Sequence, residues 1–245
     1  DAIEAQALAP GLDDPAILEW YRYLDLGYRL PIVAGTDKMS AEVPVGAVRT
    51  YTHLLTDEAL TFDAWAAAVR AGRTFVTSGP ILELTVDGRE PGEVIQLSSP
   101  GHLEVVARAR ASQPMIAAVE LVVGGRVVAR VEAAAAATEL TLNETIPVEA
   151  GTWIAARTRS DHVIQSAFTT SMAAHTSPVY VEVRDRPLVP SAAEAEVVEQ
   201  LIAGAQAWVA ELAPIDDPAD RDRMVAYFAA SLGTFRERLG GSRPG

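Results

Sequence analysis

The stretch AVELVVGGRVVARVEA, from Ala118 to Ala133, carries the clearest structural signal in this chain of 245 residues. Apolar and polar residues alternate on both sides of Gly124–Gly125. Alternation with a period of two is typical of a β-strand that buries one face. Two alternating arms joined by a Gly-Gly pair predict a tight antiparallel hairpin, because glycine readily adopts the positive φ angles that such turns need.

Further segments on both sides of this hairpin show the same alternation. They are ILELTVDG, HLEVVARARAS, TELTLNETIPV, TWIAARTRSD and SPVYVEVRD. Short alternating strands at this spacing are typical of an antiparallel β-sandwich. We therefore expect residues 81–186 to form such a sandwich.

The part before the sandwich, residues 1–80, combines strand and helix signals. The chain begins with an alternating segment, a helix is predicted over residues 16–30, and residues 32–34 form an apolar strand. A strand, a helix and a buried strand in this order predict a βαβ unit with parallel strands. Ligands collect at the carboxyl ends of such strands, where Gln6 and Asp37 are expected to lie.

The last part, residues 187–245, is predicted to be an antiparallel helix pair. Ser191 and Glu194 match a capping box at the start of the first helix. Each helix then carries an apolar stripe with helical spacing. The stripes are Val198, Leu201, Ile202, Ala205, Trp208, Val209 and Leu212 in the first helix, and Met224, Phe228, Leu232, Phe235 and Leu239 in the second.

Composition and charge limit the class of protein. The formal net charge of −13 and the pI near 4.7 oppose binding to nucleic acid or to an anionic membrane surface. The lack of cysteine excludes disulfides, thiolate zinc sites and a cysteine nucleophile. No segment approaches the roughly 20 apolar residues that a membrane helix needs. These properties leave the compartment open.

Asp37, in the stretch LPIVAGTDKMS, has two interpretations. An aspartate after a strand is most often a turn or cap residue, whereas at the end of a parallel strand it can ligate a hard cation or zinc. Its position by itself leaves both open. Lys38, Arg49 and Arg73 are candidate anion contacts, with ordinary surface charge as the alternative. Among four widely spaced histidines, His53 is the strongest candidate for a site.

Five segments together resemble a known family. They are EWYRYLDLGYRLPIVAGTDKM, PVGAVRTYTHL, TFDAWAAAVRAGRTFVTSGPILELTVDG, PGEVIQL and AHTSPVYVEV. In this order they resemble the C-terminal half of the CehA/McbA-type metallohydrolases, which belong to the PHP superfamily of polymerase and histidinol phosphatase domains. The resemblance covers about residues 1–183. The combination of AGRTFVTSGP with AHTSPVYV is far more specific than any single short motif.

The resemblance implies an α+β, multidomain fold. It predicts the C-terminal part of a distorted (β/α)7 PHP barrel over residues 1–80, the antiparallel β-sandwich over 81–186 and a helical hairpin over 187–245. It also implies a metal cluster at the carboxyl ends of the barrel strands. Asp37 matches the acidic ligand of a GSD-x-H-like segment, here GTDKM, and Met39 stands where many PHP proteins have histidine.

The activity implied by the resemblance is metal-dependent hydrolysis. The full protein would act on a phosphoester, ester, amide or carbamate-like bond of a small-molecule substrate, with a divalent metal of the Zn, Mn or Fe class. The early strands that carry HxH-type ligands in the family are not in this chain, which also begins without methionine. We therefore expect most ligands in a missing N-terminal part, and no activity from this chain alone. The expected metal ligand is Asp37, and the candidate substrate contacts are Gln6, Lys38, Arg49, His53 and Arg73.

Two other functions stay open. The methionine at position 39 favours a non-catalytic binding module, in which the β-sandwich would bind carbohydrate or a protein partner beside a degenerate barrel. A purely structural segment is the third alternative.

Overall fold

The computed structural model describes residues 2–5, 15–55, 57–160, 162–164 and 170–241. Two compact units make up the chain. The first contains residues 1–24 and 28–188, and the second contains residues 25–27 and 189–245.

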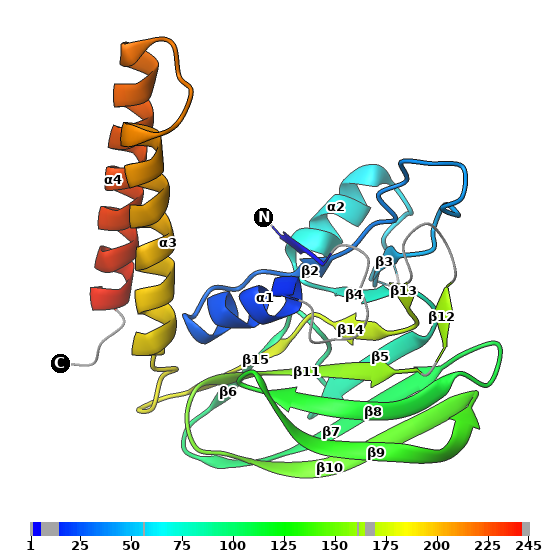
Figure 1. Cartoon of the computed structure of the whole chain (residues 1–245). Helices are drawn as coiled ribbons and strands as arrows, with labels where there is room; N and C mark the ends of the chain where they lie inside the picture. Colours follow the sequence, from blue (N-terminus) through cyan, green and yellow to red (C-terminus); the bar gives the residue numbers. More distant parts are fainter. Residues whose placement is uncertain (1, 6–14, 56, 161, 165–169, 242–245) are drawn as a thin grey trace. The chain divides into compact units, whose positions relative to one another are not determined.

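The first unit is rich in short strands (Figure 1). Its strands are β1 (Ile3–Glu4), β2 (Ile32–Val33), β3 (Arg49–Thr52), β4 (Thr74–Thr77), β5 (Ile81–Val86), β6 (Val94–Leu97), β7 (Gly101–Arg110), β8 (Ile116–Val123), β9 (Arg126–Ala137), β10 (Glu139–Val148), β11 (Thr152–Arg159), β12 (Val163–Ile164), β13 (Thr170–Ser171), β14 (Ala174–Thr176) and β15 (Val179–Val183). Its helices are α1 (Pro15–Asp25), which ends at the unit boundary, and α2 (Phe62–Arg70).

Two sheets pack face to face and form a β-sandwich, as expected, but it also takes in β3 and β4 from before residue 81, and β6 pairs with β15 in parallel, so it is not purely antiparallel and not confined to residues 81–186. The smaller sheet has the antiparallel order β10-β7-β5. The larger sheet has the order β3-β4-β14-β11-β15-β6, with β8 paired to β11 and β9 paired to β8. Alternate residues of each strand meet in one apolar core, which includes Leu84, Leu103, Leu121 and Ile154. Period-two alternation identified the buried faces of β5 and β7 correctly, whereas β8 and β11 are buried at nearly every residue.

The Gly-Gly hairpin is confirmed. Strands β8 and β9 pair antiparallel on either side of Gly124 and Gly125. Their φ angles of 50° and 74° lie in the left-handed region, as a two-residue hairpin turn requires. The arms are longer than the quoted stretch, since β9 continues to Ala137.

The larger sheet is buried on both faces around β11. Ile154 faces the sandwich core, whereas Trp153 packs against the apolar side of α1, which includes Trp20 and Tyr21. Trp20 and Trp153 have ring centroids 6.3 Å apart. Helix α1 thus covers the outer face of the sheet. The buried residues of α1 are Ile17, Trp20, Tyr21 and Leu24, which share one face of the helix.

The predicted βαβ unit is present in part. Strands β1 and β2 pair in parallel, Ile3 opposite Ile32 and Glu4 opposite Val33, and α1 lies between them in the sequence. Each of these strands has two residues.

The predicted fold class, which begins with the C-terminal part of a distorted (β/α)7 PHP barrel, is wrong. After α2 a barrel would continue with a parallel strand. Instead β4 pairs antiparallel with β3 and β14 and belongs to the larger sandwich sheet. Burial explains this placement, because Val76 packs in the cluster with α1 while Phe75 packs against the sandwich core. A strand with apolar neighbours on both faces is stable inside a sheet that is covered on both sides.

The second unit is a helix pair, α3 (Ala192–Glu211) and α4 (Pro218–Gly241). The Ser191 side chain caps α3 by accepting a hydrogen bond from the Glu194 backbone N–H. Arg221 of α4 donates to the carbonyls of Val209 and Ala213, so its guanidinium satisfies carbonyl groups at the end of α3. None of the helices that the structure describes is long and apolar enough to cross a membrane.

Candidate functional site

Asp37 lies just after the carboxyl end of β2, at an exposed position. Its φ of 45° is in the left-handed region, which aspartate tolerates better than most residues. The neighbouring β1 brings a second carboxylate near this segment, since a Cβ atom at Gly35 would lie 3.5 Å from Glu4 Oε1. Within the described ranges, no three His, Asp or Glu side chains gather in a way that could hold a metal ion. The assignment of Asp37 as a metal ligand therefore stays a prediction.

Three other predicted contact residues do not meet at a common site. Gln6 lies outside the described residues. The Lys38 ammonium donates to the carbonyls of Ser40, at 2.8 Å, and Val43, at 2.7 Å, so it holds its own loop together. Arg49 donates to the Gly46 carbonyl at 3.0 Å and more weakly to the Gly79 carbonyl at 3.4 Å.

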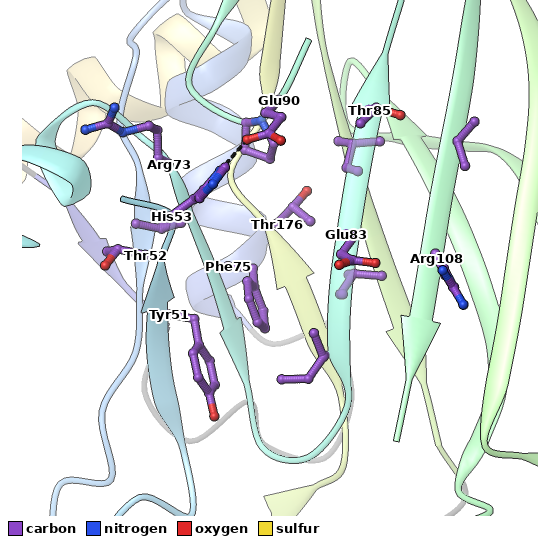
Figure 2. A pocket seen from close by; sticks show the side chains of 16 residues that line it. Tyr51, Thr52, His53, Arg73, Phe75, Glu83, Thr85, Glu90, Arg108 and Thr176 are labelled. Atoms are coloured by element: carbon purple, nitrogen blue, oxygen red, sulfur yellow. Dashed lines mark hydrogen bonds and ion pairs between the residues drawn. The ribbon is translucent and has the colours of Figure 1, made fainter. Parts of the chain in front are cut away.

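His53 and Arg73, in contrast, lie side by side on the wall of one cavity. The cavity has a volume of about 530 Å³, within the usual range for a ligand site. Figure 2 shows Tyr51, His53 and Phe75 on one side and Glu83, Thr85 and Arg108 on the other, with Thr176 between them. The lining residues are Tyr51, Thr52, His53, Arg73, Thr74, Phe75, Ile81, Leu82, Glu83, Leu84, Thr85, Glu90, Pro91, Val106, Arg108 and Thr176.

Antiparallel register explains why these side chains share a face. The ladder between β3 and β4 places Tyr51 opposite Phe75. It continues one step further, where the His53 backbone N–H donates to the Arg73 carbonyl at 2.8 Å. Residues that are directly opposite in a ladder point to the same side of the sheet. The rings of Tyr51 and Phe75 accordingly stack, with centroids 5.0 Å apart and planes 7° from parallel.

The polar end of the cavity is formed by His53 and Glu90. His53 Nδ1 lies 2.5 Å from Glu90 Oε2, so the carboxylate orients the imidazole. An imidazole held through Nδ1 can use Nε2 to exchange a proton or to bind a ligand group. Both side chains are about half exposed, which keeps this pair accessible from solvent.

Arg73 adds a positive charge beside this pair. Its side chain is 17% exposed, and Nη2 lies 3.5 Å from Glu58 Oε2. Among the atoms that the structure describes, its Nε is buried without a hydrogen-bond partner. Buried nitrogens of this kind usually have partners, so Arg73 retains capacity for a further acceptor.

Several lining residues were not identified from the sequence. Tyr51 and Phe75 were part of quoted motifs and Glu90 lies between two of them, but nothing in their local pattern indicated a cavity. A usable signal was the alternation of Tyr51 with His53 on one strand and of Arg73 with Phe75 on the next. That signal requires the pairing partner and the register, which the sequence does not specify.

Comparisons with known proteins give slight likenesses only. No family model and no curated protein matches the chain. Among solved structures, the fibronectin(III)-like modules of Clostridium thermocellum CbhA are 20% identical with a TM-score of 0.27, over 45% of this chain and 48% of theirs. The CARDB domain of PF1109 from Pyrococcus furiosus is 15% identical with a TM-score of 0.27, over 43% and 98%. Superoxide reductase (neelaredoxin) from Ignicoccus hospitalis is 17% identical with a TM-score of 0.25, over 43% and 82%.

These likenesses are confined to less than half of this chain, and the chain spans about half of the CbhA modules that it matches. At such TM-scores they carry no argument about function.

Proposed function

We propose that this chain is the C-terminal portion of a metal-dependent hydrolase that acts on a phosphoester, ester, amide or carbamate-like bond. The observation that carries the proposal is the parallel pair β1–β2, with Asp37 four residues beyond Val33 in the segment that follows the carboxyl end of β2. Carboxyl ends of parallel strands are the usual place for catalytic ligands in α/β proteins. The motifs that resemble CehA/McbA-type metallohydrolases support the same conclusion.

The donors at this position fit part of a metal site. Asp37 can supply a carboxylate oxygen, and Glu4 Oε1 lies close to Gly35 in the same segment. Two carboxylates are fewer than the three protein ligands that a catalytic zinc site generally has. The remaining ligands would come from a part of the protein outside this chain. When bound, a divalent metal of the Zn, Mn or Fe class would polarise the scissile bond and lower the pKa of a bound water.

The test uses the full-length polypeptide that contains this chain. We expect Asp37→Asn to lower bound metal, measured by mass spectrometry after dialysis, and to lower hydrolysis of p-nitrophenyl phosphate and p-nitrophenyl acetate at least about tenfold, as the loss of one metal ligand should. Asp87→Asn is a matched control, because Asp87 is also exposed, follows a strand and has a φ of 46°. Equal metal content and activity in the two variants would refute the proposal.

The 245-residue chain by itself should neither hold a divalent metal tightly nor hydrolyse these substrates. About one tightly held metal per chain, lost on Asp37→Ala, would show that the ligand set is complete within this chain.

A second candidate function is a non-catalytic binding module, which the cavity beside β5 favours. The two candidates differ in one measurement. A full-length protein that binds no metal and hydrolyses neither substrate, but binds a ligand at the cavity, would be a binding module.

A further inference from the structure

Strand β5 is an edge strand whose backbone borders the cavity. It pairs with β7 on one side, and no other described strand pairs with its second side. The cavity is lined by consecutive β5 residues from Ile81 to Thr85. Side chains alternate between the two faces of a strand. A wall made of consecutive residues therefore indicates that the strand presents its edge to the cavity.

Two leucines establish this orientation. Leu82 and Leu84 line the cavity, yet each residue as a whole, backbone included, is only 2% or 3% exposed, and both belong to the sandwich core. Because both side chains pack in the core, the small part of each residue that reaches the cavity is backbone.

The hydrogen-bond register agrees. The Asp87 N–H donates to the Glu104 carbonyl, so the odd-numbered residues of β5 direct their backbone groups towards β7. The even-numbered residues direct theirs to the other side, where Val86 exchanges hydrogen bonds with Arg89. The segment that turns back after Val86 continues to Pro91, which also lines the cavity. Proline has no backbone N–H, so Pro91 cannot donate a hydrogen bond to the edge of β5. Leu82 and Leu84 are thus left with two N–H and two C=O groups on the cavity side.

Next to this edge lies an uncovered part of the larger sheet. Strand β5 contacts β14 and β11 across the sandwich, whereas β3 and β4 extend beyond it in the strand order. Tyr51 is 40% exposed although it lies on the face that Phe75 turns towards the core. The smaller sheet therefore ends at β5 and leaves this part of the larger sheet uncovered. A strand added beside β5 would cover the stacked pair Tyr51–Phe75.

We propose that the cavity binds an extended peptide, which adds as a fourth strand to the free edge of β5. About four backbone hydrogen bonds would join it to Leu82 and Leu84. Alternate peptide side chains would rest on Tyr51 and Phe75 and should be apolar. The intervening ones would face solvent and should be polar. This site does not depend on the proposed hydrolase activity, and it specifies the ligand class of the binding-module alternative.

A second copy of the chain does not fit this edge. If two copies paired through β5, the second β5 would bring along its own β14 and β11, which lie across the sandwich from it. Those strands would need the space that β3 and β4 of the first copy occupy. A single extended segment carries no such second layer.

The first test is hydrogen exchange of the protein alone, followed by NMR. The amides of Glu83 and Thr85 should exchange slowly, because they bond to β7. Those of Leu82 and Leu84 should exchange faster than those of Glu83 and Thr85, although both residues are nearly fully buried, because their amides have no strand partner. Slow exchange at Leu82 and Leu84 in the free protein would overturn the proposal.

The second test uses a fluorescein-labelled heptapeptide with valine at three alternate positions and threonine or lysine between them. We expect saturable binding by fluorescence anisotropy, with new protection of the Leu82 and Leu84 amides. Two N-methylated versions, one methylated at the valines and one at the intervening residues, should differ by roughly thirtyfold in Kd, because only one set of N–H groups faces β5. Equal Kd values, or no saturation by about 1 mM, would overturn the proposal.

Tyr51→Ser should weaken binding of the unmethylated peptide roughly tenfold, because it removes an aromatic contact surface. Val128→Ser is the control, since Val128 is exposed on β9, which does not border the cavity. Circular dichroism of both variants would verify that they remain folded. Equal loss in both, or no loss with Tyr51→Ser, would contradict the proposed position of the peptide.

Discussion

Tyr21 Oη lies 2.5 Å from His175 Nε2, and this buried hydrogen bond joins α1 to β14. His175 Nδ1 lies 2.8 Å from the Thr176 carbonyl oxygen, to which it must donate as N–H. The Nε2 atom of the neutral ring therefore accepts from the Tyr21 hydroxyl. The imidazole also stands edge-on to Trp20, with ring centroids 5.2 Å apart. We infer from these contacts that His175 is neutral and that its role is structural, since it stabilises the packing of α1 on the larger sheet.

Stability should fall in acid because of His175. Burial lowers its pKa from 6.5 to about 3. Between these values the unfolded chain binds a proton that the folded chain does not, so the free energy of unfolding should fall as pH drops from about 6.5 towards 3, by up to about 1.4 kcal/mol per unit. Urea unfolding at several pH values measures this slope. His175→Gln should flatten it. His102→Gln, at an exposed position on β7, should leave it unchanged.

Glu120 should be important for stability. Its buried carboxylate accepts from Arg157 Nε at 2.5 Å and from Arg130 Nη1 at 2.9 Å. Glu120→Ala would leave the buried Arg157 without this partner and should cost about 3–5 kcal/mol in urea unfolding. The control is Glu132→Ala, which removes an exposed carboxylate that also pairs with Arg130 and should cost less than about 1 kcal/mol. Similar losses in the two variants would show that burial of Glu120 does not matter.

Gly92 should not tolerate a side chain. Its φ is 90°, and a Cβ atom would lie 2.1 Å from the Ala71 carbonyl oxygen. Gly92→Ala should therefore destabilise the protein by more than about 4 kcal/mol. Gly88→Ala separates the cost of a positive φ from the cost of a steric clash. Gly88 has a φ of 73° but open space around it, so only the conformational cost of about 1–2 kcal/mol should appear. Thermal unfolding of both variants would test this; an equally mild effect at Gly92 would mean that the backbone there can shift.

Strand β7 offers a direct test of which face is buried. Leu103 is fully buried in the sandwich core, whereas Val106 on the same strand is 41% exposed. Leu103→Ala should cost about 2–5 kcal/mol, because it leaves a cavity in a close-packed core. Val106→Ala should cost less than about 1 kcal/mol, because little packing is lost. Denaturant unfolding curves of the two variants would compare them, and a reversed order would contradict the register of β7.

Local patterns in the sequence predicted local structure well. The hairpin at Gly124–Gly125 and the helix cap at Ser191 were both correct, because each depends on residues close together in the chain. The parallel pairing of β1 and β2 also followed from the order of strand, helix and strand.

The site was only half predictable. His53 and Arg73 were identified as candidates by their chemistry, but the same argument selected Lys38 and Arg49, which do not line the cavity. Lys38 bonds backbone carbonyls of its own loop, whereas Arg49 bonds the Gly46 and Gly79 carbonyls and the hydroxyl of Tyr51. The sequence does not distinguish a charged side chain that lines a cavity from one that hydrogen-bonds to backbone carbonyls of a loop. The distinction depends on what lies opposite it, here the edge of β5.

Strand alternation, helix periodicity and capping residues can be predicted from the sequence, because they depend on the backbone geometry of one segment and on the hydrophobicity of its side chains. The pairing of β4 with β3 and β14 cannot be predicted in this way, since an apolar alternating strand fits any sheet with two covered faces. For that reason the strand expected in a barrel lies in a sandwich. The cavity beside β5 arises from the same long-range pairing, because it exists only where the smaller sheet ends before the larger one.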